Sequence, residues 1–157
     1  MNIASLFSGC GGLDLGLIES GHEIVFTHDF DKDCVDTYEL NIGKHITLGD
    51  IKDLNGNDIP PHDMITGGFP CQGFSVANIY RDTLDERNFL YIQMCRVISE
   101  TLPKYFLAEN VPGILSLGNG KVVKVIDKEF SCIGMDKGHP GYDVKRVTVI
   151  ASRYGVP

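Results

Sequence analysis

The sequence of 157 residues contains no apolar run long enough to cross a bilayer, and no signal-peptide pattern follows Met1-Asn2. It also lacks a CxxC pair and a Cys/His cluster, and its five cysteines are odd in number and widely separated. These absences argue against a membrane-spanning helix, a disulfide framework and a zinc site. We therefore expect no bound metal, no membrane and a reducing, cytoplasmic setting.

Basic residues are few, since 14 Lys and Arg stand against 21 Asp and Glu, which gives a formal charge of −7. Nucleic-acid binding needs a basic face, so the surface as a whole is not a nucleic-acid footprint. Hydrophobic residues make up 43% of the chain, which is ordinary for a globular protein with a core. Any nucleic-acid function must use a locally basic face or residues outside this chain.

Strand-like and helix-like segments alternate along the chain, without a repeat, a low-complexity segment or a linker. The expected strands are apolar on both sides, which is typical of a parallel sheet covered on both faces. The sequence therefore predicts one doubly wound α/β domain over residues 1–157, with a mostly parallel sheet. The expected strands are Ile3–Phe7, Glu23–Thr27, Ile46–Leu48, Met64–Thr66, Tyr105–Ala108 and Tyr142–Ile150. The expected helices are Leu13–Ser20, Lys32–Leu40, Asn88–Glu100 and Lys121–Ile133.

One stretch, Gly67-Gly68-Phe69-Pro70-Cys71, follows the fourth expected strand and presents a cysteine directly after a proline. A cysteine at a strand end suits a nucleophile that is held over a sheet. A small apolar residue in a buried turn, where free cysteines usually lie, is an equally good interpretation of this stretch alone.

Ligands of doubly wound folds bind beyond the carboxyl ends of the strands, where the glycine-rich turn Ser8–Gly12 should meet two acids, Asp29 and Asp50. The turn departs from a dinucleotide fingerprint, because Asp14 stands where the third glycine is needed. A carboxylate near a helix start suits a cationic group and repels a pyrophosphate. S-adenosylmethionine therefore fits this turn, and NAD fits it poorly.

The acids and the aromatic residue at these strand ends suit a nucleoside. Asp29 is placed to bind ribose hydroxyls, Phe30 to stack on a purine and Asp50 to accept from an exocyclic amine. Taken singly, each acid is equally well interpreted as a helix cap or a solvated loop residue. Taken together, in register at strand ends, they favour a nucleoside site.

The chain resembles the C5-cytosine DNA methyltransferase family over essentially its whole length. The most specific motifs are Pro-Cys-Gln-Gly-Phe-Ser and Glu-Asn-Val, in this order after the glycine turn. The matching segments are Phe7–Gly12, Asp29–Asp31, Gly49–Ile51, Pro70–Ser75, Glu109–Val111 and Gly141–Val144. The resemblance implies a Rossmann-like S-adenosylmethionine-dependent methyltransferase fold that acts on double-stranded DNA, in a restriction-modification setting of the bacterial type.

The chemistry that the family performs requires a nucleophile and an acid. Cytosine C5 becomes nucleophilic enough to take a methyl group when a thiolate adds to C6, and charge then develops at N3. The resemblance assigns Cys71 as the nucleophile, Glu109 as the partner of N3 and Asn110 as the residue that fixes the backbone around Glu109. The target cytosine must be flipped out of the stack, and the loop 75–87 is expected to cover it.

The resemblance also assigns ligand contacts. It places S-adenosylmethionine at Phe7, Gly9, Gly11, Asp29, Phe30, Asp50, Ile51, Pro70 and Leu90. It places DNA at Gln72, Ser75 and Arg87. For Arg87, a surface ion pair with Asp85 or Glu86 is an equally good interpretation.

Two departures from the family pattern matter. Asp29 stands where the family more often has Glu, which shortens the reach toward a ribose. The family also continues beyond Tyr154–Pro157 with Gln-x-Arg-x-Arg, a target-recognition domain and a final helix. We therefore expect an incomplete domain, truncated before the target-recognition domain that carries most of the basic surface. A complementing C-terminal polypeptide or self-association is then expected at the exposed sheet edge.

Three other functions compete with a DNA methyltransferase. One is a catalytically silent remnant, or a split-enzyme subunit, that binds S-adenosylmethionine. Another is a tRNA cytosine methyltransferase, which shares the catalytic core, although Gly73-Phe74-Ser75 favours DNA. An NAD-dependent oxidoreductase is the weakest, because Asp14 interrupts the fingerprint.

Overall fold

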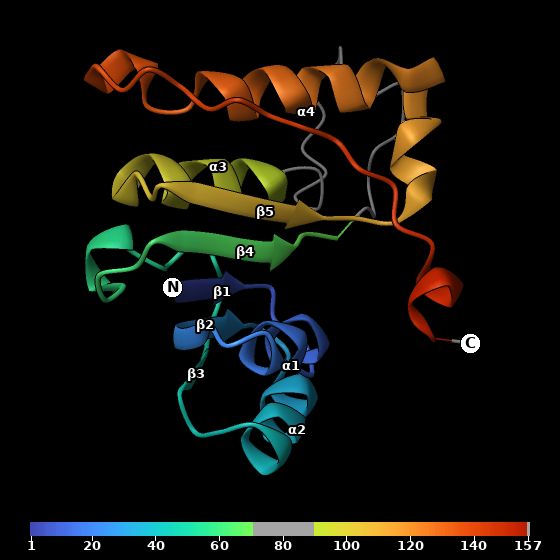
Figure 1. Cartoon of the computed structure of the whole chain (residues 1–157). Coiled ribbons are helices and arrows are strands. Elements are labelled where there is room, and N and C mark those ends of the chain that lie inside the picture. Colours follow the sequence, from blue (N-terminus) through green and yellow to red (C-terminus); the bar gives the residue numbers. More distant parts are fainter. Residues whose placement is uncertain (71–89, 157) are drawn as a thin grey trace.

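The computed structural model describes residues 1–70 and 90–156. Its strands form one sheet in the order β3-β2-β1-β4-β5, and each pair of neighbours is parallel, so the strand arrows in Figure 1 run in the same sense. The strands are β1 (Asn2–Leu6), β2 (Glu23–Asp29), β3 (Ile46–Leu48), β4 (Met64–Gly68) and β5 (Tyr105–Glu109). The helices are α1 (Gly12–Glu19), α2 (Lys32–Asn41), α3 (Leu90–Thr101) and α4 (Lys121–Cys132). Single helical turns occur at η1 (Gly56–Asp58), η3 (Pro112–Leu115), η4 (Leu117–Gly120), η5 (Met135–Lys137) and η6 (Ala151–Tyr154).

Helices cover both faces of the sheet, as the sequence predicts. Successive residues of a strand point to opposite faces. Ile3 of β1 accordingly packs in a cluster with Leu17 of α1, whereas Leu6 of β1 lies in the larger cluster that contains Met94 of α3 and Phe130 of α4. The prediction of a doubly wound parallel sheet is confirmed.

The strand order reverses between β1 and β4. The connections from β1 to β2 and β3 run over one face through α1 and α2, and the connection from β4 to β5 runs over the other face through α3. In such sheets ligands bind in the crevice at this switch point, beyond the carboxyl ends of the strands. The ends of β1 and β4 meet closely there, because a Cβ on Gly67 would lie 2.7 Å from the Leu6 carbonyl oxygen.

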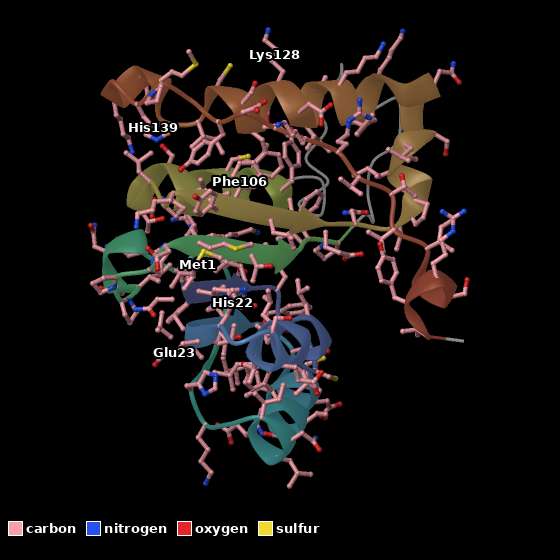
Figure 2. All side chains as sticks on the ribbon, viewed as in Figure 1. Met1, His22, Glu23, Phe106, Lys128 and His139 are labelled. Carbon is pink, nitrogen blue, oxygen red and sulfur yellow. The ribbon has the colours of Figure 1, made fainter. Side chains whose placement is uncertain are left out.

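Aromatic rings fill the space between β5 and α4. Phe106 stacks on Phe130 with ring centroids 4.9 Å apart, and the edge of Tyr142 meets Phe106 at 5.2 Å. Figure 2 shows Phe106 on β5 below α4, whereas Lys128 of α4 points away from the sheet. Aromatic pairs in these arrangements stabilise a core beyond their buried area.

The prediction of a last strand over Tyr142–Ile150 is wrong. Within the described ranges 1–70 and 90–156, these residues pair with no strand, and their first part, 142–146, instead lies alongside α4 (Figure 1). The Tyr142 amide donates to the Ser131 carbonyl at 3.0 Å, and the Tyr142 hydroxyl donates to the Pro103 carbonyl at 2.7 Å. Alternation of apolar residues favours an extended segment, but a strand also needs a partner.

The expected helix Leu13–Ser20 is present as α1, but its apolar residues are only partly buried. Leu13 and Ile18 are each 37% exposed, and the fully buried side chain of α1 is that of Asp14. The other expected helices and strands lie within two residues of their predicted bounds wherever the structure describes them. None of the helices in the described part of the chain has both the length and the apolarity that a bilayer crossing requires.

Candidate active site

Three of the predicted ligand-binding segments come together at the carboxyl ends of β1, β2 and β3. The Ser8 amide donates to the His28 carbonyl at 3.2 Å, which joins the glycine turn to the end of β2. The Gly49 amide donates to the Asp29 carbonyl at 3.0 Å, which joins the residues after β3 to the same point. The Gly-rich turn, Asp29 and the segment that carries Asp50 therefore share one edge of the sheet.

The Asp29 carboxylate holds this edge together. Its Oδ2 accepts from the Gly9 amide at 2.7 Å, and its Oδ1 accepts from the Asp31 amide at 2.9 Å. The residue is 7% exposed. An ionised carboxylate offers about four acceptor positions, so two amide donors leave capacity for the hydroxyls of a bound ribose.

Phe7 and Phe30 flank the turn in different ways. Phe7 has a φ of 54°, which is a strained conformation for a residue other than glycine, and such strain gathers at functional sites. The Phe7 ring lies at the switch point, since its Cδ2 would be 3.4 Å from a Cβ on Gly67. Phe30 is 71% exposed, so its ring is open to stacking.

The two glycines of the turn have different surroundings. Gly9 has a φ of 53° and faces open space, because a Cβ there would meet no atom of the described residues within 4 Å. Gly11 has a φ of 87°, and a Cβ there would lie 2.2 Å from Ile42 Cδ1 and 2.7 Å from the Tyr38 ring. Gly9 therefore leaves room for a ligand, whereas Gly11 lets the turn pack against α2.

Asp50 and Ile51 differ in exposure. Asp50 is exposed, and its Oδ1 accepts from the Lys52 amide at 2.9 Å. Ile51 is 3% exposed and belongs to the main core cluster, so its side chain is not free to contact a ligand. The carbonyl of Ile51 accepts from Arg96 at 2.7 Å, a contact that sequence reasoning missed.

Asp14 does not face the ligand edge, which corrects the reason given above for a cationic ligand. The side chain is fully buried, and its carboxylate accepts from Ser5 Oγ at 2.6 Å, Thr27 Oγ1 at 3.3 Å and the Tyr38 hydroxyl at 3.0 Å. Burial raises the pKa of Asp14, and these hydrogen bonds offset part of the rise. Asp14 ties β1, β2 and α2 together beneath the turn.

The ends of β4 and β5 bring Glu109 and Asn110 to the predicted cysteine loop. Glu109 is the register partner of Gly68, and a Cβ on Gly68 would lie 3.1 Å from Glu109 Oε2. Asn110 Nδ2 donates to the Phe69 carbonyl at 2.7 Å, while its Oδ1 accepts from the Val111 amide at 2.9 Å. The side chain of Asn110 thus clamps the end of β5 to the backbone that leads into Pro70.

The remaining predicted residues are placed in part. Pro70 is half-buried, and Leu90, the first residue of α3, packs against the main core cluster. Cys71, Gln72, Ser75 and Arg87 lie outside the described residues, so their roles remain predictions.

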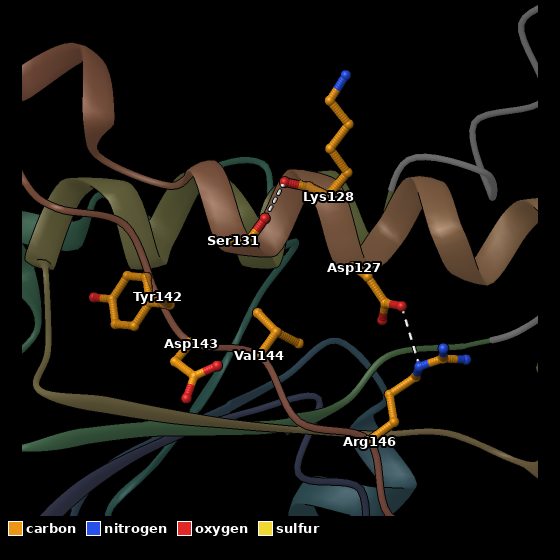
Figure 3. A pocket seen from close by; sticks show the side chains of 7 residues that line it. All are labelled: Asp127, Lys128, Ser131, Tyr142, Asp143, Val144 and Arg146. Carbon is orange, nitrogen blue, oxygen red and sulfur yellow. Dashed lines mark hydrogen bonds and ion pairs between the residues drawn. The ribbon is translucent and has the colours of Figure 1, made fainter.

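A separate pocket opens between α4 and the segment 142–146 (Figure 3). An ion pair crosses it, with Arg146 Nε 3.1 Å from Asp127 Oδ2. It contains none of the predicted site residues. The lining residues are Asp127, Lys128, Ser131, Tyr142, Asp143, Val144 and Arg146.

Relatives of this chain are named as Type II methyltransferases. It is 40% identical over 156 residues to the Type II methyltransferase M.FnuDI of Fusobacterium nucleatum, covering 99% of this chain and 43% of the relative. It is 32% identical to the Type II methyltransferase M.HhaI of Haemophilus parahaemolyticus, covering 100% of this chain and 46% of the relative. The chain therefore spans less than half the length of these relatives.

Two solved structures that resemble this chain are also methyltransferases. A DNA modification methyltransferase encoded within a prophage (E. coli) superposes with a TM-score of 0.69 at 34% identity, over 83% of this chain and 38% of that one. The Dnmt2 methyltransferase of S. pombe superposes with a TM-score of 0.66 at 26% identity, over 83% of this chain and 42% of that one.

The family comparison covers the whole chain. The sequence model of C-5 cytosine-specific DNA methylases matches residues 1–157. Methyltransferases of this family take their methyl group from S-adenosylmethionine, and the open space at Gly9, the remaining acceptor capacity of Asp29 and the exposed ring of Phe30 fit that cofactor. The chain belongs to the C-5 cytosine-specific DNA methylase family.

Proposed function

We propose that this chain forms a single catalytic and cofactor-binding domain of a DNA cytosine-5 methyltransferase of the restriction-modification type. The Type II methyltransferases to which it is about 40% identical support this proposal. Since the chain spans less than half their length, the proposal assigns the chemistry to this chain and the reading of DNA sequence to a further polypeptide region. We propose that the enzyme acts in the cytoplasm, since the relatives M.FnuDI and M.HhaI are from bacteria.

Bound S-adenosylmethionine supplies an electrophilic methyl group at the sheet edge. The Cys71 thiolate adds to C6 of a flipped-out cytosine, which turns C5 into a nucleophile. Glu109 donates a proton or a hydrogen bond to N3, where charge develops. After the methyl group has moved to C5, the C5 proton leaves to a base and the Cys71–C6 bond breaks, which restores the thiolate and the aromatic ring.

The observation that carries the proposal is the clamp between the ends of β4 and β5. A carboxylate and an amide follow one another at the end of β5, and the amide donates at 2.7 Å to Phe69, two residues before Cys71 in the chain. The carboxylate of Glu109 lies over Gly68, where the absence of a side chain leaves it accessible. Addition at C6 requires a cysteine, and protonation at N3 requires an acid near it. Glu109 lies beside the backbone that leads to Cys71.

The cofactor contacts proposed here follow the same edge. Gly9, Asp29, Phe30 and Asp50 offer open space, acceptor oxygens and an exposed ring. Phe7, Gly11, Ile51, Pro70 and Leu90 complete the proposed set, with Gly11 and Ile51 acting through the backbone because of their packing. DNA contacts are proposed for Gln72, Ser75 and Arg87.

A complementing polypeptide is proposed at β5. In the described part of the chain β5 pairs with β4 alone, so its other edge carries unpaired backbone groups. Tyr105 and Leu107 on this strand are 57% and 39% exposed. Apolar side chains next to a free strand edge suit a polypeptide that continues the sheet.

Covalent trapping tests the proposal. The chain is mixed with S-adenosylmethionine, a duplex containing 5-fluorocytosine, and a polypeptide that carries the M.FnuDI region outside the match to this chain. A base can remove a proton from C5 but not a fluorine. The Cys71–C6 adduct should therefore persist and shift the protein band in a denaturing gel. Cys71→Ser should abolish the adduct, Glu109→Gln should slow its formation by about 100-fold or more, and Cys132→Ser on the exposed side of α4 should leave it unchanged.

Two results count against the proposal. An adduct that survives Cys71→Ser rejects the assigned nucleophile. Cofactor binding in calorimetry without any adduct, with or without the added polypeptide, favours a silent S-adenosylmethionine-binding remnant instead.

A further inference from the structure

Two cysteines meet beside the proposed cofactor site. The sulfur atoms of Cys10 and Cys34 are 3.8 Å apart. Cys10 is exposed in the glycine turn, and Cys34 is half-buried in the first turn of α2. The two thiols therefore link the turn after β1 to the helix after β2.

The two sulfur atoms are close enough that a small shift would bring them to bonding distance. A disulfide bond holds its sulfur atoms about 2.05 Å apart, so closure requires an approach of less than about 2 Å. Cys10 lies between Gly9 and Gly11, which have φ values of 53° and 87°. Glycine on both sides gives the turn backbone the freedom that a small shift of Cys10 requires.

We propose that Cys10 and Cys34 are a site of reversible oxidation, which forms an intramolecular disulfide that weakens S-adenosylmethionine binding. The oxidant is a low-molecular-weight disulfide. The Cys10 thiolate attacks one sulfur of that oxidant, expels the other as a thiolate and leaves a mixed disulfide. Cys34 then loses its proton to solvent and attacks the Cys10 sulfur, which expels the second thiolate, so two protein thiols are oxidised and one external disulfide is reduced.

The environment of each thiol sets this order. Burial and the contact with Cys10 raise the pKa of the Cys34 thiol to about 11, so Cys34 is protonated at neutral pH. Cys10 is exposed and is therefore the sulfur that a dissolved oxidant reaches. Cys34, 3.8 Å away, is placed to complete the exchange.

The disulfide should weaken cofactor binding because both cysteines neighbour residues that hydrogen-bond to Asp29. Gly9, the neighbour of Cys10, donates its amide to Asp29 at 2.7 Å. Asp31 accepts from the Cys34 amide at 3.2 Å and donates its own amide to Asp29 at 2.9 Å. Drawing the sulfur atoms together displaces the turn from the Asp29 carboxylate, and this step rests on the proposed cofactor role of Gly9 and Asp29.

The first measurement concerns the bond alone. The chain is incubated with oxidised glutathione, digested without reduction and mapped by mass spectrometry. A Cys10–Cys34 peptide pair should form, should disappear on addition of dithiothreitol, and should be absent from Cys10→Ser and Cys34→Ser but present in Cys132→Ser. Two separate glutathione adducts, or two free thiols, would overturn the proposal. Because Cys10 is exposed, Cys10→Ser is expected to keep the fold.

The second measurement concerns the cofactor. Calorimetric titration with S-adenosylmethionine should give a dissociation constant several-fold higher for the oxidised chain, restored by dithiothreitol, whereas Cys10→Ser should bind equally before and after oxidant. A disulfide that leaves the affinity unchanged rejects the control of binding. Failure of the reduced chain to bind S-adenosylmethionine counts against the proposed function and leaves the result on the disulfide standing.

Discussion

Arg96 of α3 donates from Nη2 to the carbonyl of Ile51 at 2.7 Å, although the two residues are 45 positions apart in the chain. Its Nη1 donates to the Leu54 carbonyl at 2.8 Å and to Glu100 Oε1 at 2.9 Å. Glu100 Oε2 in turn accepts from the Gly56 amide at 2.7 Å. The segment that follows Asp50 is therefore fastened to α3 by one guanidinium and one carboxylate.

Removing this guanidinium should weaken both the fold and the cofactor site. Arg96→Gln leaves the carbonyls of Ile51 and Leu54 without their donors, which should lower the free energy of unfolding by about 1–3 kcal/mol. Asp50 loses its support at the same time, so the affinity for S-adenosylmethionine should fall. Urea unfolding and calorimetric titration measure the two effects.

A matched pair of variants separates this role from charge alone. Arg96→Lys keeps the charge but not the planar fork that reaches two carbonyls, so it should restore little of the lost stability. Arg153→Gln removes an exposed cation and should leave both measurements unchanged. An Arg96→Gln protein with the urea midpoint of the parent would contradict the prediction.

Asn110 should matter for catalysis more than for cofactor binding. Asn110→Asp replaces the donor to the Phe69 carbonyl by an acceptor, so the end of β5 should separate from the backbone that leads into Pro70. We expect the rate of 5-fluorocytosine trapping to fall while the dissociation constant of S-adenosylmethionine stays unchanged. Asn110→Ala, which removes the donor without adding charge, should have a smaller effect, and equal rates in all three proteins would reject a positioning role.

The sequence predicted what depends on local pattern. The alternation of apolar segments sufficed for the parallel sheet, and the position of Asp29 directly after a strand sufficed to place it at the ligand edge. Helical spacing on Lys121–Ile133 likewise placed α4 correctly, because Val122, Ile126 and Phe130 form its buried face. Such features need only the period of an element and the direction of its strands.

Contacts between distant segments could not be predicted in this way. The place of Asp14 near a helix start predicts an acid that faces the ligand. Its side chain is instead buried, where it accepts hydrogen bonds from three hydroxyl groups of β1, β2 and α2. Arg96 and Glu100 read as an ordinary helix pair at i and i+4, and nothing local indicates the carbonyls of Ile51 and Leu54. Val147 and Val149 alternate as in a strand, but pairing depends on a neighbour that local pattern does not identify.

The buried carboxylate of Asp14 makes a prediction about pH. Burial raises its pKa from 3.8, so the folded chain binds this proton more tightly than the unfolded chain does. The contribution of Asp14 to stability is therefore largest at low pH and falls as pH rises from 3.8 through its folded-state pKa. Asp14→Asn removes this titration while it keeps a polar side chain of the same shape.

Urea unfolding of both proteins across this pH range measures the effect. The stability of the parent relative to Asp14→Asn should fall as pH rises. Asp63 and Glu100 act in the opposite direction. The contact with Lys104 lowers the pKa of Asp63. Burial opposes the lowering of the Glu100 pKa, but hydrogen bonds from Arg96 and the Gly56 amide outweigh it. Both acids are present in both proteins and cancel in the difference. If the difference in stability between the two proteins did not change with pH, the pKa of Asp14 would not be raised by burial.

The two glycines of the turn allow the fold and the ligand site to be tested separately. Gly11→Ala would place a Cβ 2.2 Å from Ile42 Cδ1 at a φ of 87°, so overpacking adds to left-handed strain. Left-handed strain costs about 1–2 kcal/mol, and overpacking adds about 1–3 kcal/mol. We expect Gly11→Ala to lower the thermal midpoint strongly, which circular dichroism measures.

Gly9→Ala shares the strain but not the clash, because among the described residues a Cβ there meets nothing within 4 Å. It should therefore cost only the left-handed strain and remain folded. The added methyl group projects into the space proposed for S-adenosylmethionine, so the dissociation constant should rise while the thermal midpoint falls less than in Gly11→Ala. Unchanged affinity in a folded Gly9→Ala protein would place the cofactor away from Gly9, because the open space above this residue is what distinguishes it from Gly11.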